Sequence, residues 1–220
     1  MTTIVAVRKN GYAAIAADTL TTFGNTRLHA SQDASHDKIL RIGDSYVGVC
    51  GSAAHHLVLS SLLAKTPDAA MTRRLEASGA GMAAEHILPQ SAGFASNVSD
   101  VQLNSKEAIF ETFRKLHPIL KEECFLNPKE DEEDPYESSQ ITALIANSSG
   151  IFAIYSMREV FEYTQYWAIG SGHEFALGAM HQAFSRLENA ADIARAGVET
   201  GIAFDKNSDS PITLYNVKLA

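Results

Sequence analysis

Short apolar runs separated by turn-forming residues dominate the start of the chain. Residues 3–8 and 12–18 are rich in β-branched and small apolar side chains, and the pair Asn10-Gly11 stands between them. An Asn-Gly pair between two such runs is typical of a tight β-hairpin. The polar residues 26–36 that follow show no periodicity, and we expect an irregular connection there.

A second pair of apolar runs, residues 38–42 and 45–50, meets at a Gly-Asp turn and predicts another hairpin. The pattern then changes from strand to helix. Ser52 is a favourable residue to precede a first helical turn, and residues 53–63 are predicted to form a helix after it. Two hairpins therefore precede the first helix.

A longer amphipathic helix is predicted to begin at Ser105 and to run to about residue 124. Its apolar face is made of Phe110, Phe113, Leu116, His117 and Leu120. Pro118 lacks a backbone donor and is expected to bend this helix. Residues 65–103 are less regular, with short helical pieces expected over 71–76 and 82–88.

The second half of the chain returns to strands and then to helices. Four short apolar runs, each followed by polar turn residues, occupy residues 141–146, 151–155, 160–163 and 166–169. Helices are predicted over 174–187 and 189–204, and a last strand lies within 211–219. Because strands come in hairpin groups and helices in pairs, we expect two antiparallel sheets packed together with helix pairs outside.

The composition fits one domain that includes residues 1–220, with 45% hydrophobic residues to fill a core. No apolar run approaches the roughly 20 residues that span a bilayer, and the net charge of −8 argues against nucleic acid or an anionic membrane as a partner. Cys50 and Cys124 lie far apart, which argues against a disulfide framework or a zinc site and favours a cytoplasmic location.

Residues 125–139 are rich in acids and proline, but they lack the alternating acids and central glycine of an EF-hand. A solvated loop is the better interpretation. Four histidines invite a metal hypothesis, namely His36, His55, His56 and His173. No carboxylates or cysteines stand at ligand spacing from them, so neither a metal nor a cofactor is expected.

Thr2 is the first candidate for chemistry. It follows Met1 directly, and the short apolar run after it does not resemble a secretory leader, so the fold is expected to begin at residue 2. Methionine is usually removed before a small residue, which would leave Thr2 with a hydroxyl and a free α-amine. An α-amine has a pKa near 7.7–8.0 and can take the hydroxyl proton. The alternative is that Thr2 merely opens an edge strand.

Three further residues would assist such a nucleophile. Asp18 ends the strand that pairs with the first one, so the hairpin brings its carboxylate back to Thr2. Lys38 opens the next hairpin, and its charge would lower the pKa of a nearby hydroxyl. Gly51 lies at a strand-to-helix turn, where backbone N–H groups can hold an oxyanion. Taken singly, each is as well explained by a surface charge or an ordinary turn.

Taken in order along the whole chain, these features resemble the proteasome β-type subunits, which are N-terminal nucleophile (Ntn) hydrolases. The matching segments are Met1 to Arg8, Asp18, Gly24-Asn25-Thr26, Lys38, Cys50 to Ala54, Ala168 to Gly172, and Leu214-Tyr215 with Val217. The resemblance implies an α+β fold, a four-layer αββα sandwich, with insertions near 65–103 and 125–139. It also implies a threonine-type endopeptidase that assembles into stacked rings and cleaves polypeptides in an inner chamber.

The resemblance also assigns roles by position. Thr2 is the nucleophile, Lys38 tunes it, Asp18 holds Lys38, the Gly51 N–H binds the oxyanion, and Ser171, Asp205 and Ser208 surround the Thr2 amine. The start is closest to the bacterial member HslV. However, Asp209-Ser210 replaces a common Gly-Gly pair and His55 a common aspartate, as in a separate branch such as the β-proteobacterial homologues.

Several alternatives stay open. A non-catalytic ring subunit and an Ntn amidohydrolase for small amides are the two competing functions. No sequence feature supports an ATPase unfoldase partner, although the resemblance leaves one possible. The ring size and cleavage preference are not encoded in any pattern above.

Overall fold

The first sheet unites the two strands of the predicted N-terminal hairpin with two strands from the end of the chain. The computed structural model describes residues 2–63, 101–129 and 131–220. In order across this antiparallel sheet, the strands are β10 (Tyr166–Ile169), β1 (Ile4–Lys9), β2 (Tyr12–Ala17) and β11 (Thr213–Lys218). Positive φ angles at Asn10 and Gly11 close the β1–β2 turn, as the Asn-Gly pair predicts.

The second sheet is antiparallel throughout and follows the chain order of its strands. These are β5 (Ile39–Ile42), β6 (Ser45–Cys50), β7 (Thr142–Asn147), β8 (Gly150–Ile154) and β9 (Val160–Tyr163). All five were predicted within two residues of their observed ends. The second hairpin and the first three strands of the later group therefore belong to one sheet, whereas β10, the fourth, joins the first sheet.

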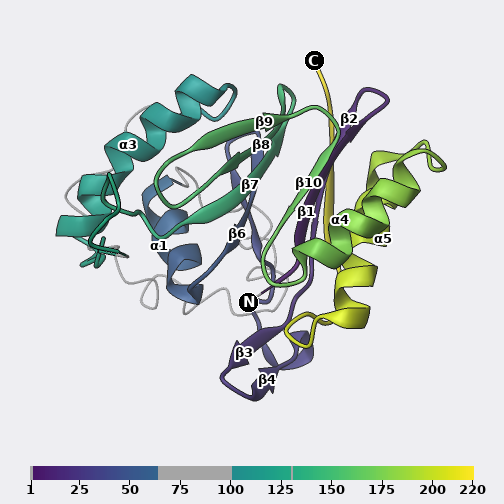
Figure 1. The fold of residues 1–220 in the computed structure, drawn as a ribbon, viewed down its shortest axis with the longest axis horizontal. Coiled ribbons are helices and arrows are strands. Elements are labelled where there is room, and N and C mark those ends of the chain that lie inside the picture. The colour runs from purple at the N-terminus through teal and green to yellow at the C-terminus, as the bar shows by residue number, and fades with distance from the viewer. Residues whose placement is uncertain (1, 64–100, 130) are drawn as a thin grey trace, which may run out of the picture.

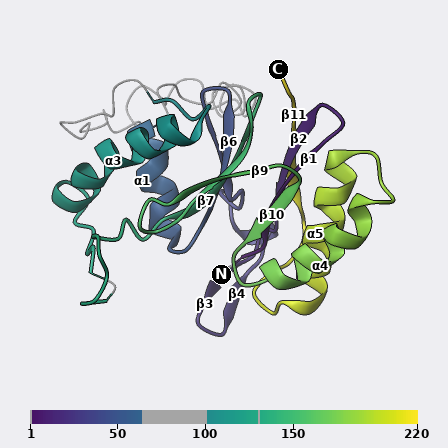
Figure 2. The ribbon, with the colours of Figure 1, turned by 45° about the horizontal axis from the view of Figure 1, so that its top comes forward.

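Two helix pairs cover the outer faces of the sheets, so the molecule has the predicted four layers (Figures 1 and 2). The helices are α1 (Ala53–Leu63), α3 (Lys106–Glu122), α4 (His173–Phe184) and α5 (Ala190–Phe204). Helices α1 and α3 pack on the second sheet, and α4 and α5 on the first. Ser105 caps α3 and Asn189 caps α5, each accepting a backbone hydrogen bond in the first turn.

Three apolar clusters fill the spaces between the four layers. The strand period of two explains why β1 serves two of them: Ile4 faces the second sheet, whereas Val5 faces α4 and α5. The third cluster lies under α1 and α3 and contains Phe113. The two sheets approach closely at Gly48, where an added Cβ would lie 2.7 Å from Ile4 Cγ2.

Two sequence predictions are wrong. Residues 26–36 are not wholly irregular, because β3 (Thr21–Phe23) pairs with β4 (Thr26–Leu28) and a 3₁₀ turn, η1 (Ala30–Gln32), follows. Strands of three residues with no buried position leave no apolar period to detect. Phe110 does not belong to the buried face of α3, since 41% of its surface is exposed; Ile109 takes that place.

Most of the remaining predictions concern the segment between α1 and β7. The short helical pieces expected over 71–76 and 82–88 lie outside the described residues. The described part of the acidic segment 125–139 contains no helix or strand, as expected of a loop. Pro118 lies within α3, which continues beyond it to Glu122. In the described ranges, no helix combines the length and apolarity needed to cross a membrane.

Candidate active site

The candidate residues gather where strands of both sheets end at one pole of the sandwich. Thr2 precedes β1, Asp18 follows β2, and Lys38 precedes β5. The β1–β2 register pairs Ile4 with Ala17, and the Asp18 N–H donates to the Thr3 carbonyl at 3.1 Å. The hairpin therefore brings Asp18 beside Thr2, near the end marked N in Figure 1.

The Thr2 hydroxyl lies between a carboxylate and an ammonium group. Thr2 is 3% exposed, and its Oγ1 donates to Asp18 Oδ1 at 2.6 Å. Lys38 Nζ donates to Thr2 Oγ1 and to Asp18 Oδ1, the latter at 2.8 Å. The Asp18 side chain is fully buried and that of Lys38 is 14% exposed. The three side chains thus form one enclosed polar triangle.

Burial of Lys38 has an electrostatic consequence. Removal from water lowers the pKa of its ammonium group, and the nearby Asp18 charge opposes this shift without cancelling it. The positive charge that remains lies next to Thr2 Oγ1, where it favours the alkoxide over the hydroxyl. A lysine whose pKa is lowered also gives up and regains a proton more readily near neutral pH.

A second network surrounds the Thr2 nitrogen. This N–H donates to Ser171 Oγ at 3.2 Å, and Ser171 Oγ donates to Asp205 Oδ2 at 2.6 Å. Ser208 Oγ also donates to Asp205 Oδ2, at 2.9 Å. Burial alone would raise the pKa of Asp205, but the hydrogen bonds from Ser171, Asn207 and Ser208 outweigh it and lower the pKa. Asp205 therefore stays ionised near the Thr2 nitrogen.

Gly51 lies at the turn between β6 and α1 with a φ of 120°, a conformation that favours glycine. The preceding Cys50 borders the site: burial raises the pKa of its thiol to about 11, against the opposing charge of Lys38 and a hydrogen bond from the Gly170 backbone. Gly51 is thus next to a residue whose thiol is influenced by the Lys38 charge. Its role as the oxyanion donor stays a prediction.

Thr3 is a site residue that the sequence prediction missed. Its N–H donates to Asp18 Oδ1 at 2.9 Å, and its Oγ1 shares a hydrogen bond with Ser208 Oγ at 2.7 Å. A Cβ added at Gly172 would lie 2.0 Å from Thr3 Oγ1. The sequence does carry a signal for Thr3. It places a hydroxyl on the same strand face as Val5 and Val7, which otherwise packs against α4 and α5.

The four candidate histidines make no hydrogen bond to Thr2, Asp18 or Lys38 in the described residues, although His55 lies beside Gly51. His173 Nδ1 contacts the Gly170 carbonyl at 2.7 Å, and His36 Nδ1 contacts the Asp33 carbonyl at 3.0 Å. Burial lowers the pKa of His55 and of His56. Over the described ranges, His, Cys, Asp and Glu side chains form no group of three that could hold a metal ion.

Comparison with known proteins gives similar solved structures. No family model and no curated protein matches the chain. Thiobacillus denitrificans BPH is 36% identical over 99% of this chain and 98% of its own, with a TM-score of 0.78. The same protein in complex with epoxomicin is 35% identical over 99% of both chains, with a TM-score of 0.77. Eukaryotic HslV from Trypanosoma brucei is 17% identical over 98% of this chain and 99% of its own, with a TM-score of 0.59.

Proposed function

Because the chain belongs to the proteasome β-type family of Ntn hydrolases, we propose that it is a threonine endopeptidase with Thr2 as its nucleophile. One observation carries the proposal: Thr2 Oγ1 is bonded to both the Asp18 carboxylate and the Lys38 ammonium group in a buried site. The alternative that Thr2 merely opens an edge strand fails, because β1 lies between β10 and β2. A hydroxyl that only opened a strand would not need this enclosed pair of charges, whose burial costs free energy.

The first step is exposure of the Thr2 amine. Within the full chain the Thr2 nitrogen belongs to the peptide bond with Met1, so removal of Met1 must come before activity. Ser171 and Asp205 then hold the new amine in place. Its neutral form accepts the Oγ1 proton, directly or through a water molecule, while the Lys38 charge stabilises the oxygen that is left.

The second step is acyl transfer. Thr2 Oγ1 attacks the carbonyl carbon of a peptide bond, and the carbonyl oxygen becomes an oxyanion that accepts a hydrogen bond from the Gly51 N–H. The C–N bond then breaks, and the protonated Thr2 amine gives its proton to the departing amine. Water attacks the resulting ester, releases the carboxylic acid product and restores the Thr2 hydroxyl.

Polypeptides are the proposed substrates, and stacked rings that enclose the active sites are the proposed assembly. Epoxomicin, the ligand of the BPH complex, is a suitable probe for the same site. The proposal includes no metal or cofactor, because the hydroxyl, amine, lysine and N–H supply every proton and charge that the two steps need. Nothing in the described residues calls for an ATPase partner.

The decisive experiment combines processing with labelling. Intact mass and N-terminal sequencing should show Thr2 as the first residue, and a peptide vinyl sulfone should add one probe mass at Thr2. Preincubation with epoxomicin should prevent this labelling. Thr2→Ala should lower peptide cleavage by at least about 10³-fold, since the nucleophile is gone, and should assemble like the wild type.

Thr2→Ser is the matched control because it keeps the hydroxyl, and it should retain labelling. Each competing function predicts a different result. A non-catalytic ring subunit would assemble but neither cleave nor label. A small-amide hydrolase would process Met1 and cleave small amides, yet leave peptides and peptide probes untouched. Full peptide cleavage by Thr2→Ala would exclude Thr2 as the nucleophile.

A further inference from the structure

The β3–β4 hairpin projects from the sandwich beside the candidate active site (Figure 1). It is a separate two-stranded sheet, and most of its residues are exposed. A two-stranded hairpin alone is only marginally stable in water. Its position therefore depends on contacts with the rest of the chain, and Arg27 of β4 and His29 just after it both reach Asp209.

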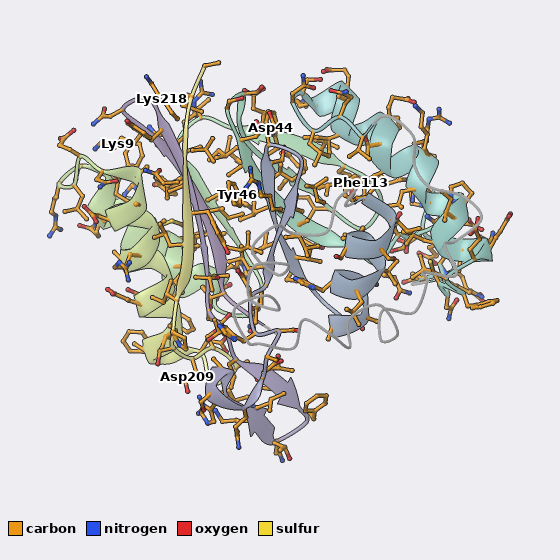
Figure 3. All side chains as sticks on the ribbon, turned by 180° about the vertical axis from the view of Figure 1, so that it is seen from behind. Lys9, Asp44, Tyr46, Phe113, Asp209 and Lys218 are labelled. Atoms are coloured by element: carbon orange, nitrogen blue, oxygen red, sulfur yellow. The ribbon has the colours of Figure 1, made fainter. Side chains whose placement is uncertain are left out.

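The Asp209 carboxylate contacts the hairpin region through Oδ2, and its Oδ1 is held by the neighbouring Ser210. Arg27 of β4 donates from Nη2 to Asp209 Oδ2 at 2.6 Å, and His29 Nδ1 lies 3.3 Å from the same oxygen. The Ser210 N–H donates to Oδ1 at 2.8 Å. The Asp209 side chain is 27% exposed, so these contacts are partly shielded from water. Figure 3 shows Asp209 beside the hairpin.

The Asp209 backbone connects these carboxylate contacts to the candidate active site. Its N–H donates to Asp18 Oδ2 at 3.2 Å, and its carbonyl accepts from the Thr19 N–H at 3.1 Å. The Leu20 N–H also donates to Asp18 Oδ2, at 3.0 Å. Hence Oδ1 of Asp18 accepts from Thr2, Thr3 and Lys38, whereas the donors to Oδ2 among the described residues are the backbone N–H groups of Leu20 and Asp209.

We propose that Asp209 is a positioning residue for the peptidase reaction, fixing the orientation of the Asp18 carboxylate through its own ion pair with Arg27. This inference rests on the proposed function. The Arg27 pair holds the Asp209 loop against the hairpin, and the loop directs its N–H at Asp18. If the pair is lost, the Asp18 carboxylate can rotate, and Lys38 and Thr2 Oγ1 lose their alignment. A glycine at position 209 would supply the backbone N–H to Asp18 but would lack the carboxylate that binds Arg27.

The test measures kcat and KM for the assembled, processed protein on the fluorogenic peptide that the wild type cleaves fastest. Asp209→Ala and Arg27→Ala should each lower kcat about tenfold and leave KM within about twofold, as a small misplacement of catalytic groups does. Arg27→Lys should keep at least about half of the wild-type kcat. The double variant should be no slower than either single variant, because both remove one interaction.

A matched control exists on α3, where Arg114 forms a similar exposed pair with Glu111 at 2.8 Å. Glu111→Ala and Arg114→Ala should leave kcat unchanged. A wild-type kcat in Asp209→Ala, or equal losses in Arg27→Ala and Arg27→Lys, would overturn the positioning role while the peptidase proposal stands. A wild type that cleaves no peptide would overturn the peptidase proposal itself. If Asp209→Ala does not fold, the comparison of Arg27→Ala with Arg27→Lys decides whether the positioning role holds.

Discussion

The two ends of the β1–β2 hairpin place a lysine in opposite circumstances. At the turn, Lys9 Nζ donates to the carbonyls of Phe184 and Leu187, which close the C-terminal end of α4. At the open end, Lys38 is buried against a carboxylate and a hydroxyl. Figure 3 shows Lys9 and Asp209 at opposite ends of the first sheet. Residue type alone therefore does not distinguish the lysine of the candidate site from the lysine at the turn.

The surroundings explain the difference. Lys9 provides a charge where a helix end presents free carbonyls, a common stabilising arrangement. Lys38 is held in a place where burial lowers the pKa of its ammonium group and where its charge acts on one hydroxyl. One lysine stabilises the fold, and the other is proposed to stabilise charge in a reaction.

Replacement of each of these two lysines by alanine should give the largest contrast in activity. Lys38→Ala should lower kcat/KM by at least about 10²-fold, because the charge beside the developing alkoxide is lost. Lys9→Ala should keep kcat/KM within about twofold but lower the Tm by about 2–4 °C, the equivalent of about 1 kcal/mol at this chain length. Peptide cleavage kinetics and thermal unfolding measure the two effects. Equal activity in the two variants would remove Lys38 from the site.

The two ends also differ in their glycines. Gly11 and Gly170 both have positive φ, but an added Cβ meets nothing within 4 Å at Gly11 and lies 2.1 Å from the Thr2 carbonyl oxygen at Gly170. Gly170→Ala should therefore displace Thr2 and lower kcat/KM by about 10²-fold. Gly11→Ala should cost about 1–2 kcal/mol of stability through backbone strain alone, with unchanged kinetics.

Labelling of Thr2 separates the effects of the two glycine substitutions. Vinyl sulfone labelling of Thr2 should be slow in Gly170→Ala and normal in Gly11→Ala. Normal labelling in Gly170→Ala would mean that the Thr2 backbone can move away from the added Cβ without harm to the site. The close approach of Gly170 to Thr2 would then be irrelevant to function.

Local features of this fold were predictable and long-range ones were not. The Asn10-Gly11 hairpin follows from neighbouring residues, and its register alone brings Asp18 to Thr2. The approach of Lys38 needs the two sheets to pack, which no local pattern specifies. The residues alone made Lys38 a candidate that a surface charge explains equally well, and the family resemblance assigned it to Thr2. The Thr3–Ser208 and Asp18–Asp209 hydrogen bonds join residues about two hundred positions apart, so only the folded chain reveals them.

Replacement of Asp205 should give the smallest effect, a loss of stability that depends on pH. Its pKa is lower in the folded protein than in the unfolded chain, so the folded state binds this proton less readily. The resulting stabilisation is complete above the unfolded pKa of about 3.9 and is lost as the pH falls through the folded pKa. Asp205→Asn keeps an acceptor for Ser171 but not the charge. Its Tm deficit should therefore be largest at pH 7 and should shrink below about pH 4.

The control for Asp205 removes an exposed carboxylate from the acidic loop. Asp131→Asn should stay within about 1 °C of the wild-type Tm at every pH, as most surface substitutions do. A deficit in Asp205→Asn that stayed constant down to pH 3 would mean that the Asp205 charge contributes nothing to stability. The hydroxyls of Ser171 and Ser208 would then order the network around the Thr2 nitrogen through hydrogen bonds that do not depend on the charge of residue 205.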